Sequence, residues 1–307
     1  MSEFFKNGGP IDAVTMPKMT LSTRIGLVQM RMHEDPQKNI AKVEKLVQKA
    51  ADRGAAIVCL PELFSLRYFA QYEEVKGAAK LAQKVPGPLC DELAGIAIAE
   101  EVVLVGGSLY EKEGKKLFNT APVFEKDGRL LGKYRKVHIP HDYSYYEQNY
   151  FAPGDLGFQV VDTSAGRVAP LICYDQWFPE AARAVALMGA DMIFYPTAIG
   201  RLRHVLEVEG NWQEAWETAM RGHAICNSIP IAAVNRCGVE DDMQFWGGSF
   251  LVDAFGNLAT HGRWGERVLI AEVHPLHTEA VREGWRFFQN RRPEQYQVLT
   301  AKKGPEA

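Results

Sequence analysis

The chain has 307 residues, a length that fits either two modest domains or one large α/β domain. Hydrophobic residues make up 47% and charged residues 24%, which excludes a disordered or collagen-like chain. Because 35 lysines and arginines face 38 aspartates and glutamates, the net charge is −3 and nucleic acid is a poor candidate for a partner.

Cysteine usage and hydropathy narrow the class further. The five cysteines are odd in number and form no C-x-x-C pair, which argues against a disulfide scaffold or a zinc ribbon and fits a reducing compartment. No run of about 18 apolar residues occurs, so no membrane span is expected. Residues 1–23 lack the apolar core of a secretory signal and are expected to form a flexible N-terminal extension. These features predict a soluble, cytoplasmic protein without a nucleic-acid or membrane partner.

The N-terminal half alternates predicted strands and helices. Asp35-Pro36 opens a helix that ends at Gly54, because apolar residues recur between them at helical spacing. Residues 56–60 form a continuous apolar run, typical of a strand that is buried on both faces. In chain order, this half predicts strand 24–30, the helix from 35 to 54, strand 56–60, a helix over about 89–100 and strand 102–109.

Hairpins and further strand–helix pairs follow. Residues 117–125 and 130–137 are joined by Lys126-Asp127-Gly128, a hairpin signal of the Asp-Gly type. A second hairpin is predicted between 248–254 and 267–273, across Phe255-Gly256-Asn257. The other predicted elements are a polar aromatic loop (141–155), strands 158–162, 168–173, 192–195 and 230–235, and helices 179–189 and 211–227. Strand–helix alternation around hairpins predicts mixed sheets covered by helices, and without a linker or repeat we expect residues 24–307 to form a single domain.

Three polar residues stand where the pattern calls for apolar ones. Glu62 ends the apolar run that begins at residue 56, Lys136 lies on a strand, and Cys173 ends another apolar run. Strand ends are where side chains enter ligand crevices in α/β sheets. A carboxylate could take the thiol proton, and a lysine ammonium could stabilise both the thiolate and an oxyanion. Such a trio suits acyl transfer from an amide or nitrile carbon.

Each of these residues also has a structural interpretation. A cysteine on an apolar strand usually fills the core, as is expected of Cys59 and Cys226. A glutamate at a strand end is usually solvated, and Lys136 belongs to a basic cluster that is typical of an exposed sheet edge. Spacing alone leaves both interpretations open, because a single sequence does not show whether the three residues meet.

Other kinds of site find less support. The sequence holds no G-x-S-x-G, G-x-G-x-x-G or P-loop string, which argues against serine hydrolases and nucleotide binding. The histidines, among them His138 and His141, lack partners at metal-ligand spacing, so neither a metal nor a cofactor is expected. The tyrosine-rich part of the loop, residues 143–151, predicts a pocket wall or an interface.

With these residues in order, the chain resembles the nitrilase (carbon–nitrogen hydrolase) superfamily from Ile25 to about Leu299. The resemblance is carried by three motifs: LPELF (60–64), GKYRKVHIP (132–140) and LICYDQWFPE (171–180). It implies an αββα sandwich that forms a homodimer or a larger homo-oligomer. It also implies that Cys173 is the nucleophile, Glu62 the general base and Lys136 the oxyanion-stabilising cation.

The same resemblance adds two expectations around the trio. Glu147, ahead of the string FAPGD (151–155), corresponds to a second glutamate of the family that positions the substrate and the lysine. The main-chain N–H of Tyr174 would contribute to the oxyanion hole.

Within the superfamily, the sequence resembles the branch of N-carbamoylputrescine amidases over residues 175–184, 194–200 and 290–293. It departs from that branch at 141–146 and 201–210, which we expect to border the pocket mouth. The predicted reaction is thiol-dependent hydrolysis of N-carbamoylputrescine to putrescine, carbon dioxide and ammonia, as part of polyamine synthesis. The cationic tail of this substrate would need a carboxylate as its partner in the pocket. Candidates for substrate binding are Asp142, Glu207, Glu209 and Trp177.

Two alternatives from the same superfamily stay open. An N-carbamoyl-β-alanine or N-carbamoyl-amino-acid amidohydrolase, or an aliphatic ω-amidase, would bind a substrate that carries a carboxylate. Arg201, Arg203 or Asn211 could then serve as the clamp. A non-enzymatic small-molecule-binding homo-oligomer is a further alternative, although a vestigial site should lack at least one of the three residues.

Overall fold

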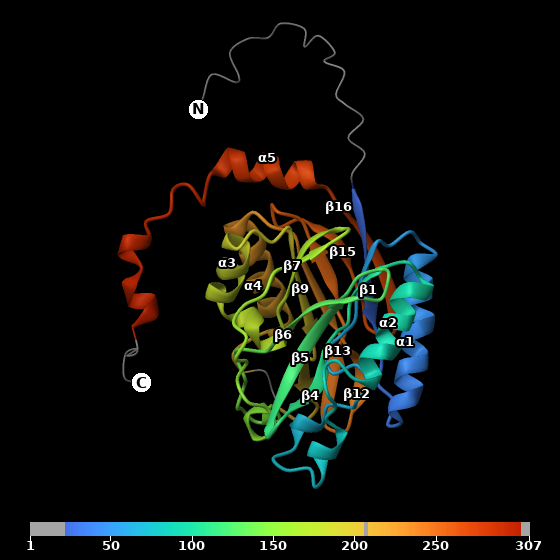
Figure 1. Ribbon diagram of the computed structural model, residues 1–307. Helices are drawn as coiled ribbons and strands as arrows, with labels where there is room; N and C mark the ends of the chain where they lie inside the picture. Colours follow the sequence, from blue (N-terminus) through green and yellow to red (C-terminus); the bar gives the residue numbers. More distant parts are fainter. Residues whose placement is uncertain (1–21, 206–207, 302–307) are drawn as a thin grey trace, which may run out of the picture.

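The computed structural model describes residues 22–205 and 208–301. Two β-sheets pack face to face, and helices cover the outer face of each, which gives an αββα sandwich (Figure 1). The fold class predicted from the sequence is therefore confirmed. Residues 1–21 of the expected N-terminal extension lie outside the described residues, and Thr23 already begins the first strand.

The first sheet has seven strands in the order β16-β1-β2-β3-β5-β4, with β6 paired to β5. Its first three neighbouring pairs show how mixed it is, since β1 runs antiparallel to β16 and parallel to β2, and β2 runs parallel to β3. The strands are β1 (Thr23–Gln29), β2 (Ile57–Cys59), β3 (Val103–Val105), β4 (Leu109–Glu113), β5 (Lys116–Phe124), β6 (Leu130–Arg135) and β16 (Arg267–Val273).

The second sheet has six strands in the order β15-β14-β11-β9-β8-β7, and a separate three-stranded sheet has the order β10-β13-β12. The six strands are β7 (Val161–Thr163), β8 (Gly166–Pro170), β9 (Met192–Thr197), β11 (Ile231–Asn235), β14 (Phe250–Val252) and β15 (Leu258–His261). The small sheet, which the sequence pattern did not predict, consists of β10 (Gly200–Leu202), β12 (Cys237–Glu240) and β13 (Met243–Trp246).

Five α-helices are described, four of them in the outer layers. Helices α1 (Pro36–Ala51) and α2 (Pro88–Ala99) cover the first sheet, and α3 (Pro179–Leu187) and α4 (Trp212–Asn227) cover the second. Helix α5 (Pro275–Trp285) crosses outside these layers (Figure 1). The short 3₁₀ helices are η2 (Phe69–Gln71), η3 (Ala78–Leu81), η4 (Glu147–Asn149), η5 (Cys173–Trp177), η6 (Pro293–Gln295) and η7 (Gln297–Thr300). None of the described helices is long and apolar enough to cross a membrane.

Strand β1 shows why the layers form. Its alternating side chains divide between two cores: Ile25 and Leu27 pack between the sheets, whereas Val28 packs toward α1 and α2. Gly26 lies under α1, where a Cβ atom would come within 2.8 Å of the Ala50 Cβ. The glycine therefore permits the close approach of helix and sheet.

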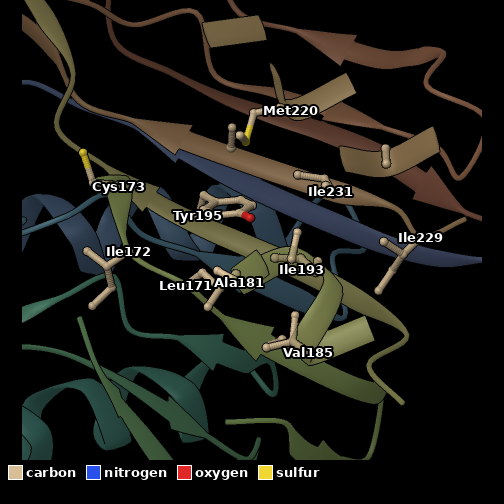
Figure 2. Close-up of a cluster of buried hydrophobic side chains, with 14 of the residues drawn as sticks. Leu171, Ile172, Cys173, Ala181, Val185, Ile193, Tyr195, Met220, Ile229 and Ile231 are labelled. Carbon is tan, nitrogen blue, oxygen red and sulfur yellow. The ribbon is translucent and has the colours of Figure 1, made fainter. Parts of the chain in front are cut away.

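The core beneath α3 and α4 leads to the end of β8. Leu171, Ile172 and Cys173 all belong to this cluster, and Figure 2 shows Cys173 at its margin, away from Val185 and Ile229. Only 6% of Cys173 is exposed. The apolar run predicted as a strand over 168–173 thus ends early, at Pro170, and its last residue begins η5 instead.

The predicted hairpin between 248–254 and 267–273 is wrong. Strand β14 pairs with β15 across the turn at Asp253–Asn257, while β16 joins the other sheet beside β1. Three of the four residues in β15 are exposed, so this strand lacks the apolar alternation that would have revealed it. The predicted strand 102–109 is likewise divided, because Gly107 adopts a positive φ of 61° between β3 and β4.

Candidate active site

The three polar residues singled out at strand ends meet in one buried cluster. Glu62 follows β2 and Lys136 follows β6, both from the seven-stranded sheet, whereas Cys173 follows β8 of the six-stranded sheet. The Lys136 Nζ lies 2.8 Å from Glu62 Oε1. Cys173 is close enough for both charges to act on its pKa. The edge between the two sheets therefore brings a carboxylate, an ammonium group and a thiol together.

The two carboxylate oxygens of Glu62 have different surroundings. Oε1 accepts hydrogen bonds from Lys136 Nζ and from Asn119 Nδ2, each at 2.8 Å. Oε2 is buried and has no hydrogen-bond partner among the described residues. One oxygen is thus fixed by two donors, and the other is left to accept a proton.

Lys136 is fully buried between two carboxylates. Its Nζ donates to Glu62 Oε1 and, at 2.6 Å, to Glu147 Oε2. Burial by itself lowers the pKa of Lys136, but Glu147 and Glu62 outweigh it and raise the pKa above its usual value. An ammonium has three N–H donors, so one remains after the two glutamates are served. Lys136 is a permanent cation with a spare donor.

Glu147 lies in η4, and its other oxygen is held by Tyr68, whose hydroxyl donates to Oε1 at 2.8 Å. Burial raises the pKa of Glu147 to about 7, against the opposing effect of Lys136. The FAPGD string that follows packs on the strand end that carries Lys136. The N–H of Gly154 donates to the Lys136 carbonyl oxygen at 2.8 Å, and a Cβ on Gly154 would lie 2.1 Å from the Arg135 carbonyl oxygen.

Cys173 begins η5 with a φ of +41°, a left-handed conformation that is strained for a non-glycine residue. Asp175 holds this turn: its Oδ2 accepts from the Ile172 N–H at 2.9 Å and from the Tyr134 hydroxyl at 2.8 Å. Burial raises the pKa of the Cys173 thiol well above its usual range, Glu62 adds to the rise and Lys136 opposes it. The resting thiol is therefore protonated and needs a base.

A buried ion pair fixes the turn that carries Glu62. The Arg236 Nη2 donates to the main-chain oxygens of Glu62 at 2.6 Å and of Leu63 at 3.1 Å, where Leu63 has a φ of +45°. Glu240 pairs with Arg236 at 2.9 Å and accepts the N–H of Tyr68 at 2.6 Å. The same pair thus supports Glu62 directly and Glu147 through Tyr68.

A pocket of about 460 Å³ opens onto Cys173. Of the predicted substrate-binding residues, Asp142, Glu209 and Trp177 line it, as do Tyr174 and Glu147. Glu207 lies outside the described residues. Among the described lining residues every charged side chain is acidic, and no lysine, arginine or histidine is present. The pocket therefore favours a ligand that carries positive charge at some distance from the thiol.

The aromatic loop contributes to this wall. Tyr143 and Tyr145 line the pocket, whereas Tyr150 and Phe151 pack in the core against Phe69. The prediction of a pocket wall is thus confirmed for the first two residues. The loop is anchored through Tyr145, whose hydroxyl donates to the Gly200 carbonyl at 3.0 Å.

The residues suggested as a clamp for a substrate carboxylate lie elsewhere. Arg201, Arg203 and Asn211 line a second hollow, separated from the catalytic pocket by β10. None of the three lines the pocket that contains Cys173. In residues 22–205 and 208–301, no group of three or more histidine, cysteine, aspartate or glutamate side chains is arranged to hold a metal ion.

Several residues of the site were not singled out in the sequence. Asn119 carries the same signal as Lys136, a polar residue within an apolar strand run, and could have been found by it. Arg236 comes directly after β11 and follows the strand-end rule. Tyr68 had no such signal, since an aromatic residue in a loop is usually a core residue.

Comparisons with known proteins agree with this geometry. The sequence model of the carbon-nitrogen hydrolase family matches residues 24–283. The chain is 36% identical to an N-carbamoylputrescine amidase of Solanum lycopersicum, over 90% of this chain and 94% of that protein. It is 35% identical to a citrullinase of Francisella tularensis subsp. tularensis, over 91% and 98%. The crystal structure of a carbon-nitrogen hydrolase from Helicobacter pylori G27 superposes with a TM-score of 0.88 at 38% identity, covering 92% of this chain and all of that one.

Proposed function

Because the chain belongs to the carbon-nitrogen hydrolase family, the nitrilase superfamily, we propose that it hydrolyses the terminal ureido group of N-carbamoylputrescine. The observation that carries this choice of substrate is the acidic lining of the pocket, with Asp142 and Glu209 beyond the thiol. A protonated amine at the far end of the substrate would pair with these carboxylates. The likeness to N-carbamoylputrescine amidases supports the same choice.

The proposed reaction begins with proton transfer from the Cys173 thiol to the unpartnered Oε2 of Glu62 as sulfur attacks the ureido carbon. The oxyanion that forms would accept from the spare N–H of Lys136 and from the main-chain N–H of Tyr174. Collapse breaks one C–N bond, and Glu62 returns its proton to the departing nitrogen. The product at this stage is a thioester-like intermediate on Cys173.

Water completes the cycle. Glu62 takes a proton from water as the oxygen attacks the intermediate, and the C–S bond breaks to regenerate the thiol. The carbamic acid released decomposes, so that one N-carbamoylputrescine and one water give putrescine, carbon dioxide and ammonia. In this scheme Glu147 positions Lys136 and the substrate. The product would place the enzyme in polyamine synthesis.

The alternative substrates from the same superfamily would need a pocket of different charge. N-carbamoyl-β-alanine, N-carbamoyl amino acids and the substrates of ω-amidases carry a carboxylate, which the acidic lining would repel. Citrulline is the most informative competitor, because the chain also resembles a citrullinase and citrulline is N-carbamoylputrescine with one added carboxylate. The two compounds share the ureido group and the ammonium group, so they isolate the effect of that single charge.

The test is ammonia release by the purified protein from N-carbamoylputrescine, citrulline and N-carbamoyl-β-alanine, with Cys173→Ala as the blank. We expect kcat/KM to be highest for N-carbamoylputrescine, lower for citrulline and lowest for N-carbamoyl-β-alanine. A higher kcat/KM for N-carbamoyl-β-alanine would overturn the proposed substrate. A Cys173→Ala protein with full activity would overturn the thiol mechanism.

We also infer that the chain forms a homodimer or a larger homo-oligomer. Large apolar side chains are exposed near the ends of three helices, at Leu187 of α3, Ile225 of α4 and Trp285 of α5. Size-exclusion chromatography with light scattering would give the mass of the protein in solution. A monomer at micromolar concentration would contradict the inference.

A further inference from the structure

We propose that the second hollow, beside β10, binds a small anion with two or more oxyanion groups. We further propose that binding of this anion changes the KM of the catalytic pocket for its substrate. This basic hollow has a volume of about 1180 Å³ and is lined by Arg201, Arg203, Asn211, Trp246, His261 and Arg263 among others. It is distinct from the pocket that contains Cys173, yet Leu202 and Val205 line both.

The charge of the hollow is unbalanced. Arg201, Arg203 and Arg263 line it, and none of them forms an ion pair within the part of the chain that the structure describes. Arg201 makes one neutral contact, from Nε to Gln244 Oε1 at 3.0 Å. No aspartate or glutamate is among the described lining residues, and His261, which also lines the hollow, pairs with Glu217 at 2.9 Å. This concentration of positive charge stands out in a chain with a net charge of −3.

A buried donor in the same wall lacks an acceptor. Only 8% of Trp246 is exposed, and its indole N–H has no hydrogen-bond partner among the described residues. An indole nitrogen can only donate, so its missing partner must be an acceptor. Buried donors in native proteins are nearly always paired. An oxyanion in the hollow would supply the acceptor.

These features define the class of ligand. The planar guanidinium group matches the two oxygens of a phosphate or a carboxylate, and three arginines around one space favour an anion with more than one such group. The N-terminus of α4, capped by Asn211, adds the positive end of a 16-residue helix at the same hollow. Polyphosphates and polycarboxylates share the required chemistry.

Strand β10 connects the hollow to the catalytic pocket. Gly200 lines the catalytic pocket, and the next residue, Arg201, lines the hollow. Gly200 is held on both main-chain atoms by Tyr145, which donates to its oxygen at 3.0 Å and accepts from its nitrogen at 3.1 Å. Tyr145 lines the catalytic pocket. An anion that fixes Arg201 therefore fixes β10 and, through it, Tyr145; this part of the inference rests on the proposed function.

Calorimetric titration of the full-length protein with pyrophosphate and, separately, with citrate tests the binding, with ionic strength held constant by sodium chloride. We expect saturable binding of one anion per chain. The variant Arg203→Ala/Arg263→Ala should bind about tenfold more weakly or worse, because each charged hydrogen bond lost costs a large part of the affinity. The matched control Lys45→Ala/Lys49→Ala removes the same charge from the exposed face of α1 and should bind like wild type.

Preference for pyrophosphate or for citrate identifies the anion class. Binding that does not saturate, or that survives in the arginine variant, would overturn the site. The effect on catalysis is measured separately, as the KM for N-carbamoylputrescine with and without the anion. A change in wild type that is absent from the arginine variant supports the connection through β10, and an unchanged KM refutes it. Because the titration needs no substrate, a failure of the proposed function would leave the binding result intact.

Discussion

Asn119 donates from Nδ2 to the oxygen of Glu62 that also accepts from Lys136, at 2.8 Å. The consequence is an asymmetric carboxylate, with Oε1 saturated and Oε2 without a partner. The main-chain carbonyl oxygen of Asn119 also accepts the main-chain N–H of Lys136 at 2.8 Å. One residue on β5, through its side chain and its main chain, therefore contacts two of the residues to which we assign catalytic roles.

Substitution Asn119→Ala is predicted to lower kcat by about a hundredfold with little change in KM, because a misdirected base loses catalysis rather than binding. The measurement is steady-state ammonia release. Asn227→Ala is the matched control, since Asn227 is also buried, also donates from Nδ2 and also has an unpartnered Oδ1, yet its Nδ2 donates to the His223 main-chain oxygen and not to Glu62. Equal losses in both variants would reduce Asn119 to a structural role.

Cys173→Ala is predicted to retain the fold and lower kcat by about a thousandfold or more, because the nucleophile is absent. Cys226 is exposed, so the expectation that it fills the core is wrong. Cys226→Ala should keep full activity, since Cys226 also lies outside the pocket. In the Cys226→Ala background, iodoacetamide should add to a single thiol per chain, as measured by intact mass. Addition that persists in the Cys173→Ala/Cys226→Ala protein would contradict the assignment.

The pH dependence should follow Glu147, whose pKa is raised to about 7. If the ionised form positions Lys136, kcat/KM rises as pH increases through about 7, and Glu147→Gln removes this rise. Stability should move the opposite way: because the folded-state pKa is above the ordinary 4.5, protonation stabilises the fold below about pH 4.5, and this contribution is lost as pH rises through about 7. A pH profile unchanged in Glu147→Gln would exclude Glu147 as its origin.

Variants of the Arg236–Glu240 pair should have separate effects on stability and on catalysis. Glu240→Gln leaves a buried cation without its partner, and a loss of about 3–5 kcal/mol in the free energy of unfolding is expected. The double variant Arg236→Leu/Glu240→Leu should be less destabilised than the single one, because no charge stays buried. The kcat of the double variant should nevertheless be lower than that of wild type, since the main-chain oxygens of Glu62 and Leu63 lose their donor. Denaturant unfolding and kcat distinguish the two effects, and a double variant with wild-type kcat would refute the positioning role.

Pocket charge predicts a selective change in KM. Asp142→Asn and Glu209→Gln should each raise the KM for N-carbamoylputrescine by about tenfold, because each removes a charged partner of the ammonium group. The KM for N-carbamoyl-β-alanine should fall or stay the same. Glu214→Gln serves as a control, since Glu214 is exposed on α4 and does not line the pocket. An equal rise for both substrates would point to damage to the pocket instead of a lost charge pair.

Much of the fold was predictable because local patterns decide it. The helix from Asp35 and the Asp-Gly hairpin appear near their predicted positions, as α1 and as β5–β6. The pairing of β16 with β1 was not predictable, since the two strands are separated by more than two hundred residues and nothing in either one selects its neighbour. The Asp253–Asn257 turn was correctly recognised, but the exposed residues of β15 hid the strand to which it leads.

The candidate site divides in the same way. Glu62, Lys136 and Cys173 could be proposed because each interrupts an apolar run, and their motifs tied them together. The arginines suggested as a clamp for a substrate carboxylate lie next to the catalytic pocket in sequence but on the other side of β10, because alternation along a strand sends neighbouring side chains to opposite faces. Arg236 follows the strand-end rule, but its contact with the Glu62 turn, like that of Tyr68 with Glu147, joins residues far apart in sequence, and no local pattern encodes such a pairing.

The division of the site between the two sheets has a consequence for how the protein matures. Glu62 and Lys136 follow strands of one sheet, and Cys173 follows a strand of the other. A chain in which only one sheet has formed therefore keeps the thiol apart from its proposed base. With the roles proposed for these residues, we expect activity only once the sheets dock, an event that needs contacts far apart in the sequence. During refolding, ammonia release should lag behind the recovery of secondary structure, which makes turnover a reporter of the last step of assembly.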